Sequence, residues 1–214
     1  MKIDWRRVLM SLGGVLTGAV AVGIFKIAAL GIDPFQSLMS GLNQVFPIPF
    51  GTLYVIVNAV LLLFSLVFNR HNIGIATFIN LFLLGYVTQF TYETLQRVIV
   101  DPSMPVRLIC LGVGIVIICI GSSLYMTADL GVSTYDSVAI TMADKWKWGP
   151  FKYIRIATDL VCVALGAGLF VLGGGRWSEV PEIVGIGTII TAFFMGPLIE
   201  FFNVRLARPL LKKN

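Results

Sequence analysis

The chain has 214 residues, of which 57% are hydrophobic and only 13% are charged, and its mean hydropathy is +0.90. Soluble domains carry about 25% charged residues, so this composition excludes a water-soluble fold and indicates an integral membrane protein. The formal net charge of +5 is expected to come from basic residues that flank membrane spans, and not from binding of nucleic acid.

Six apolar windows are long enough to cross a bilayer as helices. A helix rises 1.5 Å per residue, so about 20 apolar residues cover the roughly 30 Å of hydrocarbon. In chain order the windows are 8–30, 52–68, 73–90, 108–127, 154–172 and 183–202. The first follows a basic N-terminus, as in a signal peptide, but it is longer than a signal's apolar core. We therefore expect a retained first span.

The two halves of the chain resemble each other. The sequence LGI at 30–32 recurs as LGV at 130–132, and IGIATFINLFLLG at 73–85 aligns with VGIGTIITAFFMG at 184–196. The match includes glycine and polar positions, which chance similarity between apolar segments does not explain. We predict a single membrane domain, 1–214, made of two copies of one unit at 6–100 and 105–206.

Each copy breaks its first span and then continues into a short segment. The predicted helix breaks are Gly31, Pro34, Gly131 and Ser133. The short segments, 33–46 and 133–146, begin with residues that favour a helix N-terminus, because aspartate, serine and threonine cap helices and proline suits the first position. Each segment is expected to form a helix of about four turns, which is too short to cross the bilayer easily.

Two architectures fit these segments. The chain has either six full spans with two re-entrant half-helices, or eight spans of which two are short. The length of the short segments favours six spans. Three spans per copy would then give the two repeats opposite orientations in the membrane, whereas four spans per copy would make them parallel.

Basic residues orient the chain, because short cytoplasmic loops carry an excess of lysine and arginine. With six spans and a cytoplasmic N-terminus, the cytoplasmic segments hold twelve basic residues: Lys2, Arg6, Arg7, Arg70, Lys145, Lys147, Lys152, Arg155, Arg205, Arg208, Lys212 and Lys213. The other side holds Arg97, Arg107 and Arg176. With eight spans Arg70 moves out while Arg97 and Arg107 move in, and the excess stays on the same side. Charge therefore places both termini in the cytoplasm and leaves the span count open.

The breaks have two interpretations. Broken helices survive in hydrocarbon only where protein or a water-filled cavity receives their unpaired backbone groups. Inverted repeats with interrupted helices are the sequence signature of a solute path near the middle of the membrane. The alternative is structural: Gly31 and Gly131 end helices as C-caps, and the short helices are packing wedges.

Polar residues fall at equivalent places in the two copies. A charge at the centre of the bilayer costs at least a few kcal/mol, so such groups usually face a partner or a wet cavity. The predicted substrate-binding residues are Asp33, Asn58, Asp136 and Asp159. The predicted supporting polar residues are Lys26, Gln36, Asn80, Gln89, Arg155, Thr191 and Glu200.

Several of these residues also have a structural interpretation. Lys26 either pairs with Asp33 across the first break or extends its amine to the membrane interface. Arg155 either extends likewise or pairs with Asp159, one helical turn away. Asp33 is either a helix cap or a ligand. The alternative for Glu200 is solvation near the cytoplasmic Arg205. The alternative for Gln89 and Asn80 is a hydrogen bond between helices.

Signals for catalysis are nearly absent. His71 is the only histidine, and the three cysteines fall inside predicted spans without the spacing of metal ligands. No glycine-rich phosphate loop stands between a strand and a helix. We therefore expect no enzyme activity, no cofactor, no metal site and no nucleic-acid partner.

Several segments are similar to one family. LGIDPF at 30–35, FGTLYVIVN at 50–58, IGIATFIN at 73–80, RIATDLVCVALG at 155–166 and GIGTIITAFFMGPLIEFF at 185–202 resemble the YczE-like bacterial membrane proteins, with YyaS and the YitT group among their relatives. The resemblance covers essentially the whole chain and implies a bacterial cytoplasmic-membrane protein, without a substrate or known site residues. Ala76 departs from the pattern, which usually has glycine there.

The expected fold is an all-α polytopic membrane protein with two tandem repeats, each of three full spans and a short re-entrant or half helix. The expected function is secondary transport of a small solute through a site between the inverted repeats. The carboxylates favour a cation or a proton-coupled substrate, whereas the half-helix N-termini favour an anionic group. The alternative is a non-transporting accessory or substrate-binding subunit of another membrane complex. The lipid bilayer is the expected partner, and a homo-oligomer or a membrane partner is left open.

Overall fold

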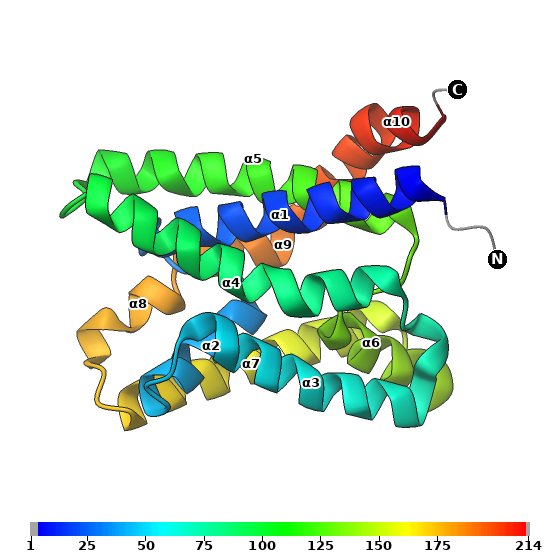
Figure 1. Cartoon of the computed structure of the whole chain (residues 1–214). Helices are drawn as coiled ribbons and strands as arrows, with labels where there is room; N and C mark the ends of the chain where they lie inside the picture. The colour runs from blue at the N-terminus through cyan, green and yellow to red at the C-terminus, as the bar shows by residue number, and fades with distance from the viewer. Residues whose placement is uncertain (1–3, 213–214) are drawn as a thin grey trace.

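The computed structural model describes residues 4–212, and throughout this range the regular elements are helices (Figure 1). The long helices are α1 (Trp5–Ala28), α3 (Phe50–Asn69), α4 (Ile75–Val98), α5 (Met104–Ala128), α7 (Phe151–Leu172) and α9 (Ile186–Phe202). The short α-helices are α2 (Pro34–Val45), α6 (Thr134–Ile140), α8 (Val180–Ile183) and α10 (Arg208–Lys212). Short 3-10 or π segments complete the chain: η1 (Arg70–Asn72), η2 (Thr141–Lys145), η3 (Trp177–Glu179) and η4 (Asn203–Ala207).

Six helical stretches of the described chain are long and apolar enough to cross a membrane. They are Trp5–Ala28, Phe50–Asn72, Ile75–Val98, Met104–Ala128, Tyr153–Leu172 and Trp177–Leu211. Each overlaps one of the six windows expected from the sequence, so the all-helical multi-pass fold is confirmed. Many large apolar side chains on these helices are exposed, among them Phe90 at 70% and Phe193 at 72%, as suits helices that face lipid.

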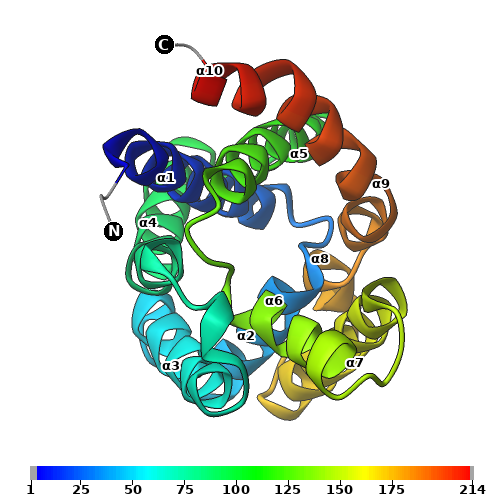
Figure 2. The ribbon, with the colours of Figure 1, turned by 90° about the vertical axis from the view of Figure 1, so that its right-hand side faces the viewer.

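The long helices run roughly side by side. The start of α1 and the helix α10 lie at the same end of the bundle, on the right in Figure 1, which we call the terminal end. The view along the bundle in Figure 2 places α3 and α4 on one side and α7 and α9 on the other. The helix α1 packs against α4 and α5, while α2 packs against α7, so contacts between the two halves of the chain build the core.

Close backbone approach sets two of these contacts. A Cβ at Gly14 in α1 would lie 2.6 Å from the backbone oxygen of Gly121 in α5. A Cβ at Gly41 in α2 would overlap the backbone of Gly166 in α7. Only glycine permits such short distances between helices, which is the usual way that membrane helices come into tight contact.

The first break is stabilised by the other half of the chain. After α1, Gly31 adopts a φ of 98°, a conformation that side chains disfavour. Its N–H donates to the Glu182 carbonyl at 3.1 Å, and the Gly187 N–H donates to the Leu30 carbonyl at 2.7 Å. The backbone groups freed by the break are thus paired with α8 and the start of α9, as an apolar environment requires.

The second break repeats this arrangement with the opposite partners. Gly131 adopts a φ of 112°. The Val132 N–H donates to the Asn72 carbonyl at 3.1 Å, and the Ala76 N–H donates to the Leu130 carbonyl at 3.0 Å. The break between α5 and α6 is therefore held by η1 and the start of α4, in the first half of the chain.

Two expectations about the breaks need correction. The C-caps of α1 and α5 are Ala29 and Asp129, with φ of 47° and 52°, so Gly31 and Gly131 are not the capping residues. The short segments also differ from uniform helices of about four turns. The helix α2 has 12 residues, whereas the second segment has 7 residues of α6 followed by 5 residues of π-helix. The π segment widens the hydrogen-bonding pattern, which periodicity in the sequence does not reveal.

Candidate functional site

A cavity of about 370 Å³ lies between the two breaks and is lined by side chains from both halves of the chain. We call it the central cavity. All four predicted substrate-binding residues line it: Asp33, Asn58, Asp136 and Asp159. Its volume falls in the range of sites for small molecules, about 300 to 1,000 Å³.

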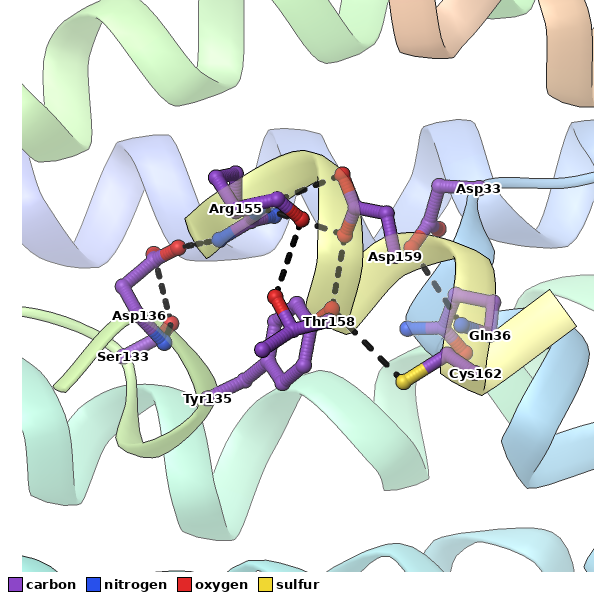
Figure 3. Close-up of polar contacts among 9 residues, drawn as sticks. All are labelled: Asp33, Gln36, Ser133, Tyr135, Asp136, Arg155, Thr158, Asp159 and Cys162. Atoms are coloured by element: carbon purple, nitrogen blue, oxygen red, sulfur yellow. Dashed lines mark hydrogen bonds and ion pairs between the residues drawn. The ribbon is translucent and has the colours of Figure 1, made fainter. Parts of the chain in front are cut away.

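The side chain of Arg155 organises one wall (Figure 3). Its Nη1 pairs with Oδ1 of Asp136, and its Nε lies 3.2 Å from Oδ1 of Asp159, one turn further along α7. The Tyr135 hydroxyl donates to Asp159 Oδ1 at 2.6 Å. The guanidinium carbon of Arg155 lies over the Tyr135 ring, 4.5 Å from its centre. The ion pair expected between Arg155 and Asp159 is confirmed, and Asp136 extends it across to α6.

The start of α6 is capped by its own side chains. The backbone N–H of Asp136 donates to the Ser133 hydroxyl at 3.0 Å, and that hydroxyl donates to Asp136 Oδ2 at 2.6 Å. Ser133 is therefore the N-cap of α6. The Thr134 hydroxyl instead donates to the side-chain oxygen of Asn58 in α3.

Asp33 stands at the start of α2 without a cation. Its carboxylate accepts the Gln36 backbone N–H at 3.2 Å, which confirms the expected helix cap. Among the side chains that the structure describes it has no ion-pair partner, although Arg155 and Asp159 lie within electrostatic range. The side chain of Gln36, only 4% exposed, lines the cavity, and its Oε1 has no hydrogen-bond partner in the described structure.

Aromatic rings complete the site. Phe35 stacks on Tyr135 with centroids 4.8 Å apart and meets Tyr54 edge-on at 6.0 Å. All three rings line the central cavity. Sequence reasoning missed Tyr54 and Tyr135 as site residues. A signal was present for Tyr135, because it follows the second break directly, as Phe35 follows the first.

The two asparagines of the site join helices. The Asn58 side-chain nitrogen donates to the Tyr54 carbonyl at 2.8 Å while its oxygen accepts from Thr134. The Asn80 side-chain oxygen accepts from the Tyr54 hydroxyl at 3.1 Å. The hydrogen-bonding role between helices expected for Asn80 is confirmed, and Asn58 serves the same purpose although it was predicted as a ligand.

The other supporting residues divide between the cavity and the rest of the molecule. Gln36, Asn80, Arg155 and Thr191 line the central cavity, as do Pro34 and Ser133 of the breaks. Lys26, Gln89, Glu200, Gly31 and Gly131 do not line it.

Of the two interpretations of Lys26, the pair with Asp33 is wrong. The Lys26 amine lies 3.2 Å from the centre of the Phe50 ring, at the start of α3, and no ion pair joins it to Asp33. Sequence proximity to the break did not reveal which face of the helix the lysine occupies.

Two further polar candidates have structural partners away from the cavity. Gln89 accepts the Gly51 N–H at 3.0 Å and so joins α4 to α3, which confirms its alternative interpretation. Glu200 lies 2.9 Å from Arg208 and accepts from Asn203, near the terminal end.

Comparison with known proteins agrees with this fold. The chain is similar to the uncharacterised protein YyaS of Bacillus subtilis, 25% identical over 94% of both chains. It is also similar to the uncharacterised membrane protein YczE of the same organism, 27% identical over 81% of this chain and 74% of the relative. An uncharacterised protein of Haemophilus influenzae is 24% identical over 87% of this chain and 78% of its own.

These relatives confirm the YczE-like resemblance of the motifs. No solved structure matches the chain significantly. The model of a family of unknown function, DUF6198, matches residues 5–204, and this chain therefore belongs to that family.

Proposed function

We propose that the protein is a secondary transporter that moves a small solute through the central cavity by alternating access. The observation that carries the proposal is the cavity itself, which sits between two helix breaks and gathers three carboxylates and one guanidinium from both halves of the chain. Ionisable groups inside a membrane domain usually mark a path for an ion or a polar solute. The relative YczE is itself an uncharacterised membrane protein.

The arrangement of the breaks supports two inverted repeats. Helix α2 runs from the middle of the bundle away from the terminal end, whereas α6 runs towards it (Figure 1). The backbone hydrogen bonds follow the same pattern, because the first break pairs with α8 and the start of α9, and the second pairs with η1 and the start of α4. In transporters, repeats related in this way take each other's conformation when the site changes the side to which it opens.

A second cavity supports an opening at the terminal end. It has a volume of about 710 Å³ and is lined by residues of the terminal-end connections, including Asn72, Asp144 and Phe151. It shares lining residues with the central cavity: Ser122, Tyr125, Asp136, Arg155, Met195 and Ile199. The Arg155–Asp136 ion pair stands where the two cavities adjoin, so we assign it the role of the barrier between them.

The opposite end is closed by helix packing. There α2 lies against α7, and a Cβ at Gly166 would be 2.6 Å from the carbonyl carbon of Ser37. Such contact leaves no room for a solute between the two helices. The structure thus fits a state that opens at the terminal end, and the repeat symmetry implies a second state in which α6 and α3 close instead.

The basic residues support a cytoplasmic position for the terminal end in a bacterial inner membrane. Arg70, Lys145 and Arg205 all belong to elements at that end (Figure 1), and short cytoplasmic loops favour such residues. Lys2 and Lys213 of the predicted cytoplasmic set lie outside the described residues.

Accessibility from both sides of the membrane tests transport without knowledge of the solute. Ser122 lines both cavities, while its neighbour Ser123 is completely buried and provides a matched control. The three native cysteines are replaced, and Ser122→Cys and Ser123→Cys are exposed to a membrane-impermeant maleimide in intact cells and in inside-out vesicles.

An alternating-access transporter predicts that the cysteine at 122 reacts rapidly in inside-out vesicles and more slowly in intact cells. The cysteine at 123 should react in neither preparation. Reaction at 122 from one side only would contradict transport and favour the non-transporting accessory role.

A further inference from the structure

The central cavity has more hydrogen-bond acceptors and negative charges than its own residues satisfy. Three carboxylates, Asp33, Asp136 and Asp159, face one guanidinium. Arg155 contacts Asp136 and Asp159, and among residues 4–212 it forms no ion pair with Asp33. A carboxylate in a membrane interior needs a compensating group, so the wall around Asp33 lacks a positive partner.

A second observation identifies the same wall independently of charge. The Gln36 side chain is 96% buried, given its 4% exposure, and its Oε1 is an unpartnered acceptor. An amide oxygen that is buried without a donor is costly, and in native proteins such groups commonly await a ligand or an ordered water. Gln36 lies one turn from Asp33 on the same short helix. The Asp33 carboxylate and the Gln36 side-chain oxygen would therefore both be satisfied by a ligand that donates hydrogen bonds.

The helix N-termini do not oppose a cation here. A free N-terminus would attract an anion through its unpaired N–H groups. At α2 the Asp33 carboxylate already accepts from Gln36, and at α6 Ser133 accepts from Asp136. The positive end of each helix is therefore compensated by a side chain of the protein, and at α2 that side chain is itself a carboxylate.

The remaining walls indicate the size and character of the ligand. The rings of Phe35, Tyr54 and Tyr135 lie on one part of the cavity, and Val22, Leu84 and Ile118 provide apolar surface elsewhere. A cation over an aromatic face is stabilised, as the position of Arg155 over Tyr135 already illustrates. A volume of about 370 Å³ is far larger than a dehydrated metal ion needs, and the apolar surface suits a carbon skeleton.

We propose that the central cavity binds a small organic cation of the primary-ammonium class, with the ammonium between Asp33 and the Gln36 side-chain oxygen and the carbon skeleton among the aromatic rings. The inference rests on the proposed function for the site's place on a transport path, and it adds the chemical class of the solute.

Thermal unfolding of the purified full chain in detergent tests this binding. The probes are ethyl-, butyl- and phenethylammonium chloride, the carboxylates propionate, valerate and 3-phenylpropionate as sodium salts, and sodium chloride at matched ionic strength. A ligand that binds the folded state raises the melting temperature in a saturable way. We expect the ammonium probes to do so and the carboxylates and sodium chloride to have no specific effect.

Two variants tie binding to the wall. Asp33→Asn retains the helix cap, because asparagine caps as well as aspartate does, but it removes the charge. We expect it to weaken the apparent affinity for the ammonium probes by about tenfold or more. Asp101→Asn is the matched control. Asp101 is exposed in the connection before α5 and has a φ of 47°, which asparagine tolerates. The affinity of this variant for the ammonium probes should be unchanged.

The second variant, Gln36→Leu, separates a ligand role from a structural one. Removing an unpartnered buried acceptor should raise the melting temperature of the ligand-free protein, while the affinity for ammonium probes falls. A purely structural glutamine would not produce these opposite changes.

The inference is overturned if the carboxylates stabilise the protein and the ammonium ions do not, if sodium alone gives the effect that depends on Asp33, or if no probe raises the melting temperature. Binding in detergent requires no movement across a membrane. Its failure is therefore distinct from one-sided labelling at position 122, which would instead remove the transport proposal.

Discussion

The two helix breaks share one backbone arrangement and differ in their side chains. At each, a glycine with positive φ, Gly31 or Gly131, meets the start of a long helix from the other half. At the second break Arg155 clamps Asp136 and the helix soon changes to a π segment. At the first, Asp33 forms no ion pair among the described residues and α2 is regular. The backbone arrangement is thus common to both halves, whereas the charges differ. The carboxylate of the second break, Asp136, is held by a cation, and that of the first, Asp33, is not.

The packing of the two short helices differs as well. Helix α2 touches α7 through glycine on both sides, at Gly41 and Gly166. Helix α6 meets α3 through the hydrogen bond between Thr134 and Asn58, and the larger cavity lies beside it. The contact at α2 is tight, whereas a cavity lies beside α6. The difference teaches that the side chains and glycines of each short helix, and not the similar backbone at the two breaks, set how closely that helix packs.

The largest effect is expected from alanine at the two breaks. Gly31→Ala and Gly131→Ala place a side chain at positive φ and against the backbone of Gly185 or Gly74, so each should destabilise the protein by about 3 kcal/mol or more. Thermal unfolding in detergent measures this loss. Gly174→Ala is the control, because Gly174 has a φ of 97° but no atom within 4 Å of its Cβ position. It should cost only about 1 kcal/mol, and an equal cost at all three positions would contradict the packing of the breaks.

A smaller loss is expected when the clamp of the second half is removed. Arg155→Met leaves Asp136 and Asp159 without their cation, which would cost about 3 to 5 kcal/mol for a fully buried pair. The three side chains are 33%, 36% and 19% exposed, so about 2 kcal/mol is more appropriate. Adding Asp136→Asn should restore part of the melting temperature. A double variant that melts lower than Arg155→Met would show that repulsion between the carboxylates is not the cause.

The contact between α2 and α7 provides a pair of matched substitutions. Gly166→Ala introduces a Cβ against the Ser37 backbone and should cost about 1 to 2 kcal/mol. Gly168→Ala, two residues further in the same helix, meets no atom within 4 Å and should be neutral or gain up to about 1 kcal/mol from helix propensity. Melting temperatures that fall equally would mean that the two helices do not touch at Gly166.

The smallest loss of stability is expected at Asp33, the carboxylate of the first break. Asp33→Asn keeps the cap, breaks no ion pair and removes a buried charge without a cation, so the protein should lose less than about 0.5 kcal/mol. Asp136→Asn should cost about 1 kcal/mol or more, since it removes a charge-assisted bond to Arg155. Comparing the two melting temperatures sharpens the contrast between the halves, and a larger loss at position 33 would reverse it.

Local chemistry made much of the site predictable. The caps at Asp33 and Ser133 follow from residue type and position, and the Arg155–Asp159 pair follows from spacing along one helix. The bond from Tyr135 to Asp159 could not be predicted, because it joins two helices whose relative rotation is set by packing.

Other features depended on information that the sequence does not carry locally. The direction of the Lys26 side chain depends on which face of α1 meets Phe50, and hydropathy alone does not show that face. The change to π-helix in η2 likewise has no local signal, since the same residues also suit a regular α-helix.

Cysteine labelling tests most directly whether the two halves are inverted in the membrane. Single cysteines are placed at His71, exposed between α3 and α4, and at Ser103, exposed before α5, in a background without the native cysteines. Intact cells are treated with a membrane-impermeant maleimide before and after permeabilisation. Inverted halves predict labelling of Ser103→Cys in intact cells and of His71→Cys only after permeabilisation. Labelling of His71→Cys and not Ser103→Cys in intact cells would contradict inversion, because the halves would then be parallel.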